Sequence, residues 1–165
     1  MNFVSEQYIK LNTPLSKNID STDILNNVQW AEIGWMRPIL GKYFYTYLLN
    51  AFSAQTLTAD EIDLVDLIKP AVAYRAAAES IVLLTAQIKN KGPQTQYGDN
   101  SASVDESLMY KVEGKLRGRA EQLENDVKDW LHEYKDLYPN YLSDLNKVIM
   151  PPDNSNNFDS GVMVI

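Results

Sequence analysis

The stretch SVDESLMYKVEGKLRGRAEQLENDVKDWLHEYKDL, residues 103–137, decides the fold class of this chain. Apolar side chains recur in it every three or four residues, which is the spacing of one face of an α-helix. These side chains are Leu108, Val112, Leu116, Ala120, Leu123, Val127, Trp130, Tyr134 and Leu137. Ser103 and Glu106 have the spacing of a capping box, and Pro139 should stop the helix. About 33 residues at 1.5 Å each would span roughly 50 Å, so we expect part of this helix to pack on something outside the chain.

Shorter helices are predicted before this one. Residues 21–37 carry apolar side chains on one helical face, and Pro38 should end or kink the helix that they form. Gly41 then permits a turn into a helix over residues 42–52.

A second capping box marks the start of a further helix. Thr58 and Glu61 have the required spacing, and the helix should run to Pro70, where it either kinks or gives way to a new helix ending near Lys89. Residues 93–102 have the composition of a polar loop.

These elements predict an all-α protein, an antiparallel bundle of about four to five helices with one long C-terminal helix. Residues 1–20 mix short apolar groups with a proline and a polar run, so we expect an extended N-terminal arm. The helical domain covers residues 21–147, and residues 148–165 should form an extended C-terminal tail. A length of 165 residues suits a single domain.

Composition excludes several classes of function. The net charge of -7 has the wrong sign for a monomeric DNA-binding protein. The chain has no cysteine and one histidine, so it lacks thiolate metal sites, a cysteine nucleophile and any site that needs two histidines. The N-terminal residues do not resemble a secretory signal, and charged residues interrupt the apolar stretch 70–88, so we expect a cytoplasm-like compartment and no membrane association.

No residue pattern predicts a catalytic, cofactor-binding or metal-binding site, and we expect a protein that is not an enzyme. His132 with Asp129 makes at most half of a helical metal site, and no nucleophile context accompanies this histidine. The acidic residues at 60–66 suit the positive end of a helix dipole.

A basic stripe runs along the long helix through Lys111, Lys115 and Arg119, which are spaced by four residues. It is either a solvated helix face, or a surface that pairs with an acidic partner or faces nucleic acid in an assembly. Gly114 and Gly118 have the same spacing and are either tolerated in the helix or allow another helix to approach closely.

The segment WAEIGWMRPILGKYFY, residues 30–45, resembles the head-tail connector (adaptor, or head completion) proteins of tailed bacteriophages, especially those of phages with Bacteroidetes hosts. In that family a helix ends in an aliphatic-proline-aliphatic-leucine-glycine motif that precedes an aromatic-rich helix. The resemblance continues through residues 67–74 and spans about residues 3–145. We expect the motif to be a structural turn that holds two helices together through Trp35, Pro38, Ile39, Leu40, Gly41 and Phe44. Glu32 replaces an expected glutamine, which we interpret as a surface change.

The resemblance implies a virion structural protein of the phage neck that is assembled in the host cytoplasm. It would form a ring, usually of twelve copies, between the portal protein and the next tail or neck protein. Genomic DNA would pass through the ring without sequence-specific binding. In this setting Lys111, Lys115 and Arg119 would serve channel or intersubunit electrostatics.

The tail is not covered by the resemblance. Its β-prone end suggests a partner-binding arm, with anchors at Phe158, Val162, Met163, Val164 and Ile165. Two alternatives to the connector function stay open, namely another neck or tail-completion protein and a small helical ligand-binding or enzymatic bundle.

Overall fold

The computed structural model describes residues 2–15, 21–85, 87–89, 92–94 and 106–142. The described chain is mostly helical, which confirms the all-α prediction. In chain order the elements are α1 Glu6–Asn12, α2 Ser21–Ala31, a π-helical segment Glu32–Met36, α3 Arg37–Leu40, α4 Lys42–Ala54, α5 Ala59–Thr85, β1 Gln87–Lys89, β2 Gly92–Gln94, α6 Glu106–Glu133 and a 3₁₀ turn Lys135–Leu137.

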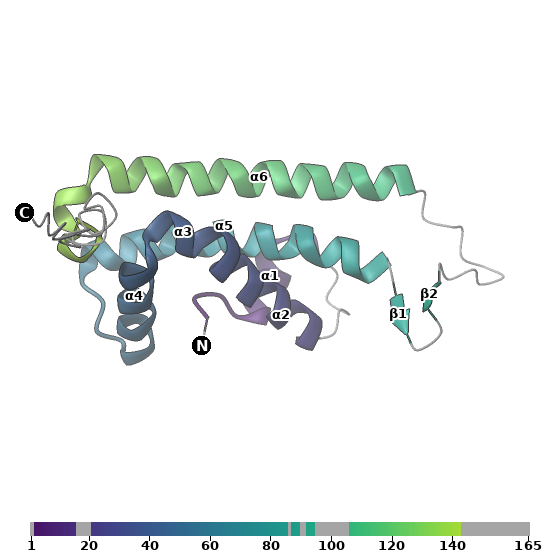
Figure 1. Cartoon of the computed structure of the whole chain (residues 1–165), viewed down its shortest axis with the longest axis horizontal. Coiled ribbons are helices and arrows are strands. Elements are labelled where there is room, and N and C mark those ends of the chain that lie inside the picture. Colours follow the sequence, from purple (N-terminus) through teal and green to yellow (C-terminus); the bar gives the residue numbers. More distant parts are fainter. Residues whose placement is uncertain (1, 16–20, 86, 90–91, 95–105, 143–165) are drawn as a thin grey trace, which may run out of the picture.

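Helices α5 and α6 form a long antiparallel pair (Figure 1). Helices α1 and α2 pack on α5, whereas α3 contacts α6 as well as α4. Helix α5 is therefore covered on two sides. Its sequence fits this position, because small side chains that allow close packing are buried along it: Ala71, Ala73, Ala76, Ala77 and Ala78. The length of α6 is matched by that of α5, so length alone no longer argues for a partner outside the chain.

The start of α5 follows the sequence prediction. Glu61 accepts a hydrogen bond from the backbone N–H of Thr58 at 2.9 Å, and the hydroxyl of Thr58 accepts one from the N–H of Glu61 at 3.3 Å. This reciprocal pair is the predicted capping box. Pro70 lies inside α5, which continues to Thr85 as one helix.

We expected residues 1–20 to form an extended arm, but part of this segment is helical. Residues 6–12 form α1, and Ser5 caps it by accepting a hydrogen bond from the N–H of Tyr8 at 3.2 Å. Phe3, Val4 and Ile9 are buried in the core. The sequence pattern missed this helix because seven residues are too few to show a periodicity.

The first predicted helix also ends later than Pro38. It passes from α2 through the π-helical segment into α3, and it stops only at Gly41. Pro38 lies at the start of α3, where a missing N–H costs little, and the wider π-helical turn precedes it.

A short antiparallel hairpin replaces the predicted end of α5 near Lys89. Strand β1 pairs with β2 in the register Gln87 to Gln94 and Lys89 to Gly92. Ser103, which belongs to the capping box predicted for the long helix, lies outside the described residues, as does the C-terminal tail with its anchors Phe158 and 162–165.

Candidate functional site

The proline-leucine-glycine motif forms the turn between α3 and α4. Gly41 has φ of 81° and ψ of 153°, a backbone conformation that only glycine adopts without strain. Leu40 and Phe44, on either side of it, are buried in the core, whereas Ile39 is half-buried and Pro38 is exposed. The structure therefore brings Leu40 and Phe44 together with the core and leaves the proline on the surface.

Trp35 does not pack with Leu40 and Phe44 at the turn; its ring contacts a buried ion pair. Arg75 on α5 donates two hydrogen bonds to the carboxylate of Glu124 on α6, each at 2.8 Å. Its guanidinium lies 4.9 Å from the centroid of the Trp35 ring. Both partners of the pair are buried. Removing one partner of such a pair leaves an uncompensated charge, so this contact fixes α5, α6 and the π-helical segment to one another.

Sequence reasoning missed both members of this pair. Arg75 lies among the alanines of residues 71–78, and a charged side chain in such a stretch is a signal of a buried partner. Nothing in the sequence identified Glu124 as that partner.

Glu32 is a buried carboxyl, and its interpretation as a surface position was wrong. Its side chain is only 1% exposed. One carboxylate oxygen accepts a hydrogen bond from the N–H of Phe3 at 2.7 Å, and the other accepts one from the hydroxyl of Tyr45 at 3.1 Å. The position follows Ile24 and Val28 at four-residue spacing, so the helical face of these apolar residues could have indicated its burial.

The environment of Glu32 favours its neutral form. Burial raises the pKa of its carboxyl to about 7, although the hydrogen bonds from Phe3, Tyr45 and Val4 act in the opposite direction. The pKa of Tyr45 is also raised, by burial and then by the carboxylate of Glu32. This one carboxyl group connects the N-terminal segment, the π-helical segment and α4.

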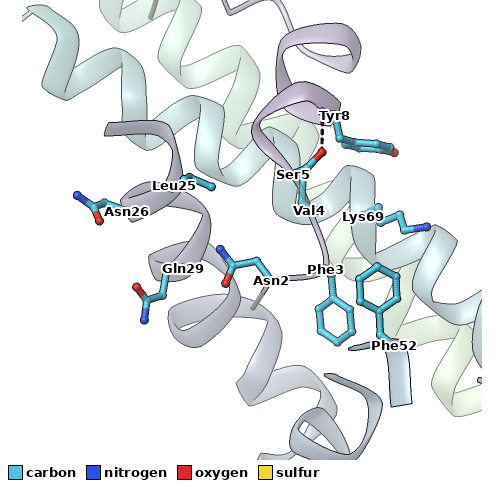
Figure 2. A pocket seen from close by; sticks show the side chains of 10 residues that line it. All are labelled: Asn2, Phe3, Val4, Ser5, Tyr8, Leu25, Asn26, Gln29, Phe52 and Lys69. Carbon is cyan, nitrogen blue, oxygen red and sulfur yellow. Dashed lines mark hydrogen bonds between the residues drawn. The ribbon is translucent and has the colours of Figure 1, made fainter. Parts of the chain in front are cut away.

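An open groove of about 630 Å³ borders the same N-terminal segment (Figure 2). It is lined by Asn2, Phe3, Val4, Ser5, Tyr8, Leu25, Asn26, Gln29, Phe52 and Lys69. The ammonium group of Lys69 is paired with Asp66 at 2.8 Å and lies over the Phe52 ring. No histidine or carboxylate is among the lining residues.

Aromatic side chains close the end of the molecule where α4, the start of α5 and the end of α6 meet. The indole N–H of Trp130 donates to the hydroxyl of Tyr138 at 2.9 Å, and that hydroxyl donates to the carbonyl of Asp60 at 3.0 Å. The Phe44 ring packs on Tyr138 with ring centroids 5.9 Å apart. These contacts give the aromatic residues at this end of the molecule a packing role.

The basic stripe is exposed on α6, as Lys111, Lys115 and Arg119 all face solvent. The Arg119 guanidinium lies 5.1 Å from the centroid of the Tyr74 ring. Within the described part of the chain, the salt bridges include neither Lys111 nor Lys115. Like charges four residues apart destabilise a helix by about 0.2–0.5 kcal/mol per pair, so the stripe does not serve the stability of α6.

Gly114 and Gly118 lie on the same exposed side of α6. A Cβ atom added at either position would meet no atom of the described chain within 4 Å. Each glycine costs up to about 1 kcal/mol in helix propensity relative to alanine. Packing within the described chain therefore gives no reason for a glycine at either position.

His132 is exposed, and the described residues provide no set of further ligands to complete a metal site with it. Among the described residues, no group of three or more histidine, aspartate or glutamate side chains could hold a metal ion. In the same residues, no helix is both long and apolar enough to span a bilayer.

Fold and contacts together define a helical protein built on one long antiparallel pair, with a buried ion pair between its two helices. Residues 36–148 match the model of a protein family of unknown function, DUF6712, and the chain belongs to this family. The match includes the turn at Gly41 and the Arg75–Glu124 pair, whereas Glu32 and the N-terminal segment precede it. No curated protein and no solved structure matches the chain.

Proposed function

We propose that this protein is a structural subunit of the neck of a tailed-phage virion, where copies form a ring between the portal protein and the next tail or neck protein. The sequence of residues 30–45 supports the proposal through its resemblance to head-tail connector proteins. The proposal gives the protein no catalytic residue, cofactor or metal.

One structural observation carries the proposal, namely that the segment 30–45 exposes some of its large apolar side chains while it buries others. Leu40 and Phe44 point into the core. On the outside, Trp30 is 56% exposed, Ile33 40% and Tyr43 57%. Aromatic residues are enriched where proteins meet, and two of these three exposed side chains are aromatic. These exposed side chains are the groups by which a subunit would contact its neighbours.

Charge is compatible with a conduit for DNA. Each subunit carries a net charge of -7, so a ring of many copies would be strongly negative. Such a ring would let the phosphate backbone slide past instead of binding it.

Binding to the portal protein encoded by the same genome tests the proposal. The wild-type chain should co-elute with purified portal rings in several copies, and cryo-electron microscopy of the virion should place it as a ring beside the portal. The double variant Trp30→Ser/Tyr43→Ser should lose this binding while keeping its helical circular dichroism. Leu11→Ser, an exposed apolar residue on α1, is the matched control.

Absence of the chain from the virion would overturn the proposal. A ring at another position in the neck or tail would support the alternative of a tail-completion protein instead.

A further inference from the structure

Exposed charges on α6 are segregated along the helix. Before Ala120 the exposed bases are Lys111, Lys115, Arg117 and Arg119, and after it the exposed acids are Glu121, Asp126, Asp129 and Glu133. Glu113, which pairs with Arg117, and Lys128 are the exceptions among the described side chains. The helix is thus basic in its first half and acidic in its second.

This order is not explained by the fold of the chain. A helix dipole favours acids near the N-terminus and bases near the C-terminus, which is the reverse of the order in α6. Two of these bases contact α5, since Arg117 lies 3.9 Å from Glu79 and the Arg119 guanidinium lies 5.1 Å from the centroid of the Tyr74 ring. The α5-facing side of α6 carries the buried residues Leu116, Ala120, Val127 and Leu131. Helical spacing puts Lys111, Lys115, Asp126 and Asp129 on the side away from these residues.

The outward side of α6 has a regular line of residues that could meet another helix. Positions 111, 115, 118, 122, 125 and 129 alternate in steps of four and three, so they lie along one side of the helix. Gly118 is in this line and Gly114 is beside it, and neither has a neighbour within the described chain. Glycines at these positions allow a second backbone to come close.

We infer that this face of α6 pairs with the same face of a second copy of the chain, with the two helices antiparallel. A two-fold axis near residue 120 would place Lys111 opposite Asp129 of the second copy, and Lys115 opposite Asn125, next to Asp126. Gly118 would lie opposite Gln122. A parallel pair in register would instead place like charges together, so charge complementarity selects the antiparallel arrangement.

The same charges argue against nucleic acid as the occupant. The basic half of the face would attract a phosphate backbone, but the acidic half continues along the same line and would repel it. A second copy satisfies both halves at once.

This pairing goes beyond the proposed ring and does not rest on it. Subunits of a ring around DNA all point the same way, so a two-fold antiparallel pair belongs to the free protein and must separate when a ring forms. The two proposals therefore depend on different residues, since portal binding is assigned to Trp30 and Tyr43.

Light scattering of the purified full-length chain tests the pairing. At low salt the mass should be about twice that of the 18.7 kDa monomer, and high salt should shift it toward one copy because exposed ion pairs are screened. The variant Lys111→Asp/Lys115→Asp should weaken association on the order of tenfold, and adding Asp126→Lys/Asp129→Lys to it should restore association. All four positions are exposed, and circular dichroism checks that each variant folds.

Cysteine cross-linking tests the antiparallel arrangement of the two helices. The natural chain has no cysteine, so only introduced cysteines can form a disulfide. On one helix Lys111 and Asp129 are about 27 Å apart, so a disulfide between Lys111→Cys and Asp129→Cys can form only between two copies. The double variant should give a covalent dimer, and Lys111→Cys alone should not. Any one of several results would overturn the inference. In light scattering these are a monomer at low salt, a mass that charge reversal does not change, or a fourfold variant that does not restore association. In cross-linking it is a single variant that cross-links as well as the double variant.

Discussion

Replacing Glu32 with glutamine should make the stability of the protein less dependent on pH. Glutamine keeps an oxygen that can accept the N–H of Phe3, and its amide N–H can donate to the Tyr45 hydroxyl. The variant therefore preserves the connections of the N-terminal segment while removing a group that can ionise. Glu32→Gln tests the electrostatics of the site without removing its hydrogen bonds.

The expected effect follows from the raised pKa of the Glu32 carboxyl. A carboxyl with a pKa of about 7 in the folded protein and 4.5 in the unfolded chain binds its proton more tightly when folded. Its contribution to stability is fully present below pH 4.5 and is lost as the pH rises through 7. The difference between the two pKa values corresponds to roughly 3 kcal/mol in the free energy of unfolding.

Urea denaturation of both proteins at pH 5, 6, 7 and 8 measures this effect. The two should be similar at pH 5, and the glutamine variant should become the more stable by about 1–3 kcal/mol at pH 8. Glu121→Gln, at an exposed position on α6, controls for the loss of one negative charge. A difference between wild type and Glu32→Gln that does not change with pH would refute the account of this site.

Three further predictions concern the core and the tail. Leu40→Ala should lower the free energy of unfolding by about 2–5 kcal/mol, since it leaves a cavity beside the turn, and an unchanged melting temperature would contradict the role of Leu40 in the core. Glu124→Ala should cost about 3–5 kcal/mol in urea denaturation because Arg75 stays buried without its partner, whereas the double variant Arg75→Met/Glu124→Leu should recover most of that loss. Deleting residues 158–165 should leave circular dichroism and melting unchanged while weakening assembly with a partner, and full assembly by the truncated protein would refute the assigned role of the tail.

Helical periodicity predicted the largest elements of the fold well. The capping box of Thr58 and Glu61, the turn at Gly41 and the long helix α6 all follow from local signals, because each depends on residues close in sequence. At Pro38, where we expected the helix to end or kink, the helix does not end but continues to Leu40, and a π-helical turn precedes the proline.

Contacts between distant residues were not predictable in this way. Glu32 meets Phe3 across 29 positions, and Arg75 meets Glu124 across 49. Charge patterns along one helix cannot reveal such partners, because their pairing depends on how separate helices are placed. The exposure of Lys111 and Lys115 was consistent with their pattern on one helix, but the open space at Gly114 and Gly118 required the structure.

The π-helical segment Glu32–Met36 makes the fold depend on the number of residues in this segment as well as on their type. Deleting one residue there would let an ordinary α-helix form, and all residues before the deletion would turn by about 100° around the helix axis. Ile24 and Val28 would then leave the surface of α5, and the Glu32 carboxyl would no longer face Phe3. Single-residue deletions in this segment should therefore be more damaging than many substitutions in it, so that sequences related to this one are expected to vary there in residue type before they vary in residue number.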